Sequence, residues 1–171
     1  MQKIVVAKPY RFVPPHHGSF WPRLILRFLP FYLRTYHGVT SVICRGTGRL
    51  RDSLEAGHGI ILAPNHCRPC DPMVLGSLAG QVRQHLYIMA SWHLFMHNRF
   101  YAWFLPRAGV FSVHREGTDR QSMKYAISLL AEARRPLMIF PEGVLSRHND
   151  RLNNLMEGAA IMARAAARQR T

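Results

Sequence analysis

The stretch 59–71, GIILAPNHCRPCD, constrains the fold of this chain more than any other. Its apolar run at 60–63 has no polar alternation, which is typical of a strand buried on both faces of a parallel sheet. Pro64 ends that strand because proline has no N–H for a sheet ladder. Pro72 and the apolar residues after it predict the first turn of a helix. The stretch therefore predicts a strand, a polar loop and a helix start, and open α/β sheets bind ligands at such places.

The rest of the chain alternates between short apolar runs and helical patterns. We expect strands at 39–44, 86–89, 110–113 and 137–140, and helices at 51–56, 72–79, 92–98, 100–105, 119–134 and 154–168. Such alternation predicts an α/β fold with a largely parallel central sheet flanked by helices. With 171 residues, 48% of them hydrophobic, the chain has enough material for one proper core.

The N-terminal part differs in character from the remainder. Residues 1–18 predict an irregular leader, and residues 19–38 predict an amphipathic helix in which Pro30 causes a kink or a split. Three arginines of this helix share nearly one azimuth among aromatic and aliphatic residues: Arg23, Arg27 and Arg34. This pattern favours a helix at a membrane interface, and a helix packed on the core is the alternative. We therefore divide the chain into 1–37 and an α/β domain at 38–171.

The formal net charge of +14 favours an anionic partner: nucleic acid, phospholipid headgroups or a phosphorylated small molecule. Three cysteines do not make a disulfide framework, and no signal-peptide pattern precedes them, so we expect a reducing, cytoplasmic setting. No run of 18 or more uncharged apolar residues predicts a membrane-spanning helix.

His66 and Asp71 lie in the loop after the 60–63 strand and have the chemistry of a general base and its orienting carboxylate. One ring nitrogen of His66 would take a proton from an attacking hydroxyl, while Asp71 would accept a hydrogen bond from the other. The alternative is that Asp71 is only a helix N-cap and His66 a loop residue. The spacing alone does not decide, because His114 and Asp119 repeat it.

Two further predicted strands end in polar residues. The 110–113 strand leads into Arg115, and the 137–140 strand leads into Glu142 and Gly143. In a parallel sheet these groups reach the same edge as His66. Arginine binds phosphate bidentately, and glycine lets backbone N–H groups approach an anion closely. A solvated Arg115 and a Glu142 paired with an arginine are the alternatives.

The strings NHCRPCD, GVFSVHR and FPEGVLSR, in this order, resemble the first three motif blocks of the PlsC-like glycerolipid acyltransferase superfamily. The first block is matched by Asn65, His66 and Asp71, the second by Gly109, Phe111 and Arg115, and the third by Phe140, Pro141, Glu142 and Gly143. The family continues the third block with Thr-Arg-Ser, where this chain has Val-Leu-Ser. We expect Ser146 and Arg147 to take the displaced polar part.

This resemblance implies transfer of an acyl group from acyl-CoA or acyl carrier protein to a glycerol phosphate or lysophospholipid. It implies that His66 deprotonates the acceptor hydroxyl, and that Arg115 and the Glu142–Gly143 turn position the acceptor phosphate. No metal or cofactor is expected. A lysolipid acceptor further implies peripheral binding to an anionic membrane surface, on its cytoplasmic face.

Three alternatives stay open. The family's fourth block, a Val-Pro-Val-like strand, does not follow the last predicted helix, so an inactive or truncated acyltransferase-like chain is one. A zinc module is another, since His66, Cys67 and Cys70 lie close together, although structural zinc needs four ligands. The third is a nucleic-acid-binding module, which the charge favours, but no recognition-helix string supports it and no nucleic acid is expected.

Overall fold

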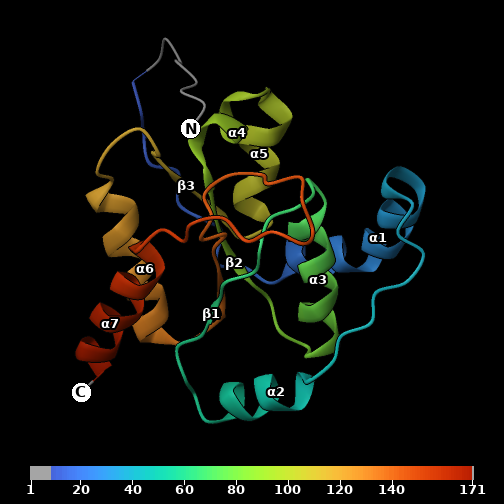
Figure 1. Ribbon diagram of the computed structural model, residues 1–171, viewed down its shortest axis with the longest axis horizontal. Coiled ribbons are helices and arrows are strands. Elements are labelled where there is room, and N and C mark those ends of the chain that lie inside the picture. Colours follow the sequence, from blue (N-terminus) through green and yellow to red (C-terminus); the bar gives the residue numbers. More distant parts are fainter. Residues whose placement is uncertain (1–8, 171) are drawn as a thin grey trace.

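The computed structural model describes residues 9–170 of the chain as an α/β unit (Figure 1). Its helices are α1 (Phe20–His37), α2 (Thr47–Glu55), α3 (Asp71–Gln81), α4 (Trp92–Met96), α5 (Arg99–Arg107), α6 (Arg120–Glu132) and α7 (Gly158–Arg170). Its strands are β1 (Ile61–Leu62), β2 (Tyr87–Ser91), β3 (Val110–Val113) and β4 (Leu137–Met138). Strands and helices alternate along the chain as their apolar runs predict.

The four strands form one sheet in the order β1-β4-β2-β3, and each pairing is parallel. Ile61 pairs with Leu137 across β1 and β4, and Tyr87 pairs with Leu137 across β2 and β4. The predicted fold class is therefore confirmed. Because the strands are parallel, the loops that follow them leave from the same edge of the sheet.

Alternating side chains of β4 and its extension divide the core into two layers. Leu137 and Ile139 pack in a cluster with α6 and α7, whereas Met138 and Phe140 pack in a cluster with α3. This is the period of two that a strand imposes on its side chains. Figure 1 shows α6 and α7 on one side of the sheet and α3 and α1 on the other.

Helix α1 has one face on the domain and one face in solvent. Leu29 and Leu33 are buried in a cluster that includes Cys70, and Leu29 reaches Gly76 of α3 so closely that a side chain there would meet it at 3.0 Å. The helix is continuous across Pro30, so of the two predicted outcomes, a kink or a split, the split does not occur. Pro30 lies on the exposed side and removes only one backbone N–H, which does not end the helix.

The segment before α1 is irregular, as predicted for the leader, but residues 9–18 are attached to the sheet. Val13 and Ser112 exchange hydrogen bonds, from Ser112 N to Val13 O at 3.0 Å and from Val13 N to Ser112 Oγ at 2.8 Å. His17 lies between the hydroxyls of Tyr87 and Tyr125, at 2.8 and 3.0 Å. Residues 1–8 of the predicted leader are outside the described part.

The prediction of a strand at 39–44 is wrong, because this segment is irregular in the structure. Val39 and Val42 pack against the cluster of Leu29 and Leu33, and Ile43 is 78% exposed. Spaced three apart, two inward-facing valines do not match the alternation of a strand. The last helix also begins later than predicted, at Gly158, because residues 151–156 form part of a loop that returns to the sheet edge.

Candidate active site

His66 and Asp71 meet directly at the loop between β1 and α3. Oδ2 of Asp71 lies 3.1 Å from Nδ1 of His66. The same oxygen accepts hydrogen bonds from the backbone N–H groups of Cys67 at 2.7 Å and Arg68 at 2.8 Å. Asp71 therefore holds both the imidazole and the loop that carries it.

The position of Asp71 decides the tautomer of His66. An ionised carboxylate only accepts hydrogen bonds, so Nδ1 of His66 carries the proton and donates it to Asp71. The free lone pair is then on Nε2, the nitrogen that would act as a base. The side chains of His66 and Asp71 are each 22% exposed, so the pair is accessible at the surface of the domain.

Asp71 is not the N-cap of α3. Cys70 occupies that position without a side-chain capping bond, and Asp71 is the first residue of the helix. Its carboxylate turns back to the loop rather than onto the first turn of α3. The simple capping alternative is thus wrong for this residue.

The ring of Phe140 stacks on the imidazole of His66, with centroids 4.0 Å apart and an interplanar angle of 26°. Phe140 reaches this position because the strand alternation points it to the α3 side of the sheet. Phe140 and Asp71 together restrict the orientation of the ring.

Glu142 is 5% exposed and joins the loop after β4 to the loop after β1. Its Oε1 accepts a hydrogen bond from the backbone N–H of His66 at 3.1 Å. Its Oε2 accepts from the backbone N–H of Asn153 at 3.2 Å and from Nδ2 of Asn153 at 2.7 Å. The His66 N–H first, and then the donors of Asn153, hold the pKa of Glu142 below its usual range. In the described part of the chain, the hydrogen-bond partners of Glu142 are therefore amide groups and not an arginine.

Ser146 supports the same loop from the other side. Its N–H and its hydroxyl both donate to the carbonyl oxygen of His66, at 2.7 and 3.0 Å. Gly143, in the same loop as Ser146, has a φ of +64°. A side chain at this position would lie 2.5 Å from the sulfur of Met156. Pro141 is buried, and its carbonyl accepts from the N–H of Met156 at 2.8 Å.

The second motif block lies farther from His66. Strand β3 is at the opposite end of the sheet order from β1, so Arg115 follows a strand about 14 Å to the side. Phe111 has no exposed surface and packs on Phe12 and Tyr125. Gly109, with a φ of +85°, makes the turn from α5 into β3.

Two other predicted residues lie at the surface beside the site. Asn65 is exposed, and its Nδ2 is 3.1 Å from the sulfur of Cys67. Arg147 is exposed and has a positive φ of 58°, directly after Ser146. Asn65 directly precedes His66, and Arg147 belongs to the loop in which Ser146 donates to the carbonyl of His66.

The second His-x4-Asp pair has a different geometry. Oδ2 of Asp119 accepts from the backbone N–H of His114 at 3.0 Å and from the hydroxyl of Tyr10, while Oδ1 caps α6 through Ser122 N. The ring of His114 instead stacks on Tyr10 with centroids 5.0 Å apart, and its Nε2 lies 3.4 Å from Glu116. Of the two pairs, only that of His66 joins a ring nitrogen to its aspartate.

The acyltransferase family model matches residues 44–170, most of the chain. The chain belongs to this PlsC-type acyltransferase family. A relative from Streptococcus pneumoniae (strain ATCC BAA-255 / R6), named 1-acyl-sn-glycerol-3-phosphate acyltransferase, is 35% identical over 107 residues. That match covers 63% of this chain and 37% of the relative, so the chain spans well under half of the relative's length. No solved structure matches the chain.

An open cavity of about 470 Å³ adjoins the His66–Asp71 loop. Asn65, Cys67 and Asp71 line it on one side, and residues of the irregular 39–43 segment line the other. A second groove of about 360 Å³ shares Val39 and Val42 and continues between α1 and α3. The first cavity thus joins polar side chains of the loop after β1 to apolar side chains of the 39–43 segment and α3.

The sequence patterns did not identify Asn153 or the lining role of the 39–43 segment. Asn153 contacts Glu142 from a loop with no motif of its own, so no local pattern identifies it. Among the described residues, no three or more His, Cys, Asp or Glu side chains are grouped to hold a metal ion. The zinc alternative therefore lacks a ligand set there.

Proposed function

We propose that this acyltransferase moves a fatty acyl group from a thioester donor to the hydroxyl of a glycerol phosphate or lysophospholipid. The observation that carries the proposal is the contact between His66 Nδ1 and Asp71, which leaves Nε2 as the base. The name of the pneumococcal relative, a 1-acyl-sn-glycerol-3-phosphate acyltransferase, supports an acceptor that carries a phosphate. Acyl-CoA and acyl carrier protein are the two donor classes.

The proposed reaction needs no nucleophile from the protein. Nε2 of His66 takes the proton of the acceptor hydroxyl while that oxygen bonds to the thioester carbonyl carbon. The carbon–sulfur bond then breaks, and the thiolate leaves with the proton from His66, giving an ester and a free thiol. Asp71 stabilises the imidazolium formed in between. General-base catalysis of this kind contributes about 10²–10⁴-fold to the rate.

We place the acceptor phosphate near Arg115, with Gly143 providing close backbone approach, as the motif blocks imply. Strand β3, which precedes Arg115, lies about 14 Å to the side of β1. The alternative phosphate ligand is Arg147, which is exposed and lies on a loop that contacts His66. The KM for the acceptor, measured for Arg115→Ala and for Arg147→Ala, distinguishes these two placements of the phosphate.

We further propose that the enzyme works peripherally at an anionic membrane surface, on the cytoplasmic side. No described helix is both long and apolar enough to cross a membrane. Helix α1 has a solvent-exposed apolar stripe at helical spacing, made of Phe20, Leu24, Phe28 and Phe31. The arginines beside it, Arg23 and Arg27, suit anionic headgroups.

The test is acyl transfer by the purified chain from labelled acyl-CoA, and from labelled acyl carrier protein, to a panel of lysophospholipids and glycerol 3-phosphate. We expect an esterified product and release of one thiol per ester. If neither donor gives product with any acceptor, the proposed reaction is wrong and the chain is an inactive member of its family. Salt-sensitive binding to DNA without binding to vesicles would favour the nucleic-acid alternative.

A further inference from the structure

The hairpin of α4 and α5 carries an exposed aromatic surface that the function proposed above does not use. Helix α5 has no fully buried residue, although it contains three aromatic side chains that are well exposed. They are Phe100 at 59%, Trp103 at 42% and Tyr101 at 38%. Helix α4 adds Leu94 at 46% and Met96 at 38%. Contiguous apolar surface of this kind marks an interaction site on a monomer.

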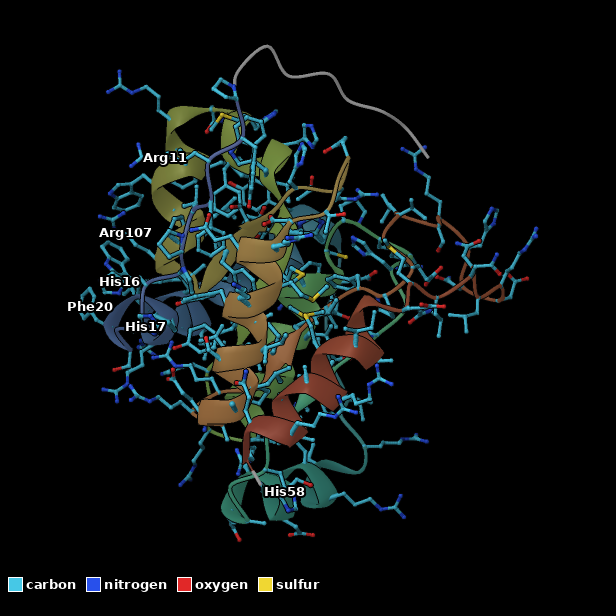
Figure 2. The ribbon with its side chains drawn as sticks, turned by 90° about the vertical axis from the view of Figure 1, so that its left-hand side faces the viewer. Arg11, His16, His17, Phe20, His58 and Arg107 are labelled. Atoms are coloured by element: carbon cyan, nitrogen blue, oxygen red, sulfur yellow. The ribbon has the colours of Figure 1, made fainter. Side chains whose placement is uncertain are left out.

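This surface is continuous with the exposed stripe of α1. The rings of Trp21 and Trp103 meet edge to face, with centroids 5.1 Å apart. The backbone N–H of His16 donates to the carbonyl of Pro106 at 2.8 Å, which joins the approach to α1 to the end of α5. In Figure 2, Arg11, Arg107, His16 and Phe20 lie along one side of the molecule. The two helices thus present one face.

The charge of this face selects its partner. No Asp or Glu occurs before Asp52, or between Asp71 and Glu116, so neither α1 nor the α4–α5 hairpin contains a carboxylate. Arg107 lies 4.5 Å from the ring centroid of Trp103 and donates to its carbonyl at 2.8 Å, while Arg99 is exposed at the start of α5. A second copy of this face would repel it, whereas anionic headgroups above an apolar layer complement it.

We infer that α4 and α5 form, together with α1, a two-part surface that docks on an anionic lipid bilayer. Trp103, Tyr101 and Phe100 enter the headgroup boundary, which amphipathic aromatic rings favour. Arg99 and Arg107 meet the lipid phosphates. The inference rests on the membrane association proposed for α1. It adds α4 and α5 as a second part of the protein that contacts the same membrane.

This docking has a consequence for the site. Helix α4 begins directly after β2, at the same edge of the parallel sheet from which His66 and Glu142 project. With the hairpin on the bilayer, the sheet edge that carries His66 and Glu142 is therefore held at a fixed position relative to the lipid. Helix α1 alone would allow the domain to rotate about the helix axis, and a second contact prevents this.

The direct test is quenching of the tryptophan fluorescence of the 171-residue chain by brominated acyl chains. The variant Trp21→Phe retains Trp92, which is 4% exposed, and Trp103. We expect vesicles of phosphatidylcholine with phosphatidylglycerol, brominated in the acyl chains, to quench this variant. Adding Trp103→Phe should abolish the quenching while the vesicles still bind, because Trp92 is inside the core. Both substitutions keep an aromatic ring and therefore protect the fold.

Flotation with the same vesicles provides an independent measurement. Phe100→Gln should weaken binding about ten-fold, because it removes one aromatic ring from the lipid contact. Ile161→Gln, an equally apolar-to-polar change at an exposed position of α7, should leave binding unchanged. Binding without quenching, and without an effect of Phe100→Gln, overturns the role of α5 and leaves the α1 proposal standing. No binding to any vesicle overturns both, and dimerisation or DNA binding lost in Phe100→Gln would assign the face to another partner.

Discussion

The backbone N–H of His66 is held by the side chain of Glu142, at 3.1 Å from Oε1. The two residues follow β1 and β4, which are neighbours in the sheet although 76 positions separate them in the chain. The Glu142 carboxylate links two loops rather than capping one of them, because its second oxygen is bound to Asn153. The candidate base is thus fixed from its ring by Asp71 and from its backbone by Glu142.

His66→Ala should abolish acyl transfer, and Asp71→Asn should lower kcat/KM about 10²–10⁴-fold. In the second variant the amide oxygen still accepts from the N–H groups of Cys67 and Arg68, but no carboxylate stabilises the imidazolium. Steady-state kinetics measures the activity of each variant, and circular dichroism checks that the variant is folded. Turnover retained by His66→Ala on the same substrate would overturn the mechanism.

His114→Ala is the matched control for that experiment, since it has the same spacing to an aspartate. We expect at most a small change in kcat/KM, because its ring does not contact Asp119. Asp119→Ala should instead cost about 0.5–2 kcal/mol of stability through loss of the α6 cap, with activity per folded molecule largely kept. A loss of activity in His114→Ala as large as that in His66→Ala would contradict the assignment of the base.

The depressed pKa of Glu142 predicts a loss of stability in acid. The unfolded chain takes up this proton near the ordinary pKa of 4.5, and the folded protein only at lower pH. The stabilisation is therefore complete above that ordinary pKa and is lost as the pH falls through it toward the folded-state value. Urea unfolding at a series of pH values should show a flatter acid limb in Glu142→Gln than in the wild type. Glu132→Gln, at an exposed carboxylate, should keep the wild-type slope.

Glu142→Gln also tests the positioning of His66. Glutamine retains one acceptor oxygen, so it preserves the contact to either His66 or Asn153 but not both. We expect a lower kcat with little change in KM for either substrate, and partial retention of activity relative to Glu142→Ala. A rise in the acceptor KM alone would mean that Glu142 contacts the substrate instead.

Arg115→Ala should raise KM for the phosphate-bearing acceptor about 10–100-fold and KM for the acyl donor much less, if this guanidinium binds the acceptor phosphate. Arg147→Ala is measured beside it, and Arg134→Ala is the control on a surface arginine away from the site. An effect confined to Arg147→Ala would place the phosphate on the loop next to His66. Equal effects of Arg115→Ala on both substrates would indicate a structural role.

Leu33 and Phe31 lie two positions apart on α1, Leu33 on its packed face and Phe31 on its exposed face. Leu33 is 2% exposed, so Leu33→Ala should cost about 2–5 kcal/mol of unfolding free energy. Phe31 is 69% exposed, so Phe31→Ala should leave stability nearly unchanged but weaken binding to anionic vesicles. Denaturant unfolding and flotation measure the two effects. A large stability loss in Phe31→Ala would mean that its face is packed rather than free for lipid.

The sequence by itself determined the order and type of most elements, because each depends on local properties. Unalternating apolar runs produced the buried strands, and Asp119 capped α6 as its position predicts. The proximity of His66 and Asp71 was also predictable, since a short loop between a strand and a helix keeps the two residues close, but the contact of the ring with the carboxylate was not. The exposed arginines of α1 followed from helical periodicity alone.

Only the tertiary structure distinguished the two His-x4-Asp pairs, because Tyr10, from a distant part of the chain, stacks on one histidine and Phe140 on the other. The strand order placed β4 beside β1 and β3 farthest away, which brought Glu142 to His66 and left Arg115 to the side. Val39 and Val42 became cavity walls rather than a strand because they pack on the apolar surface of α1 and α3. These outcomes depend on contacts between residues far apart in the chain, which no local pattern encodes.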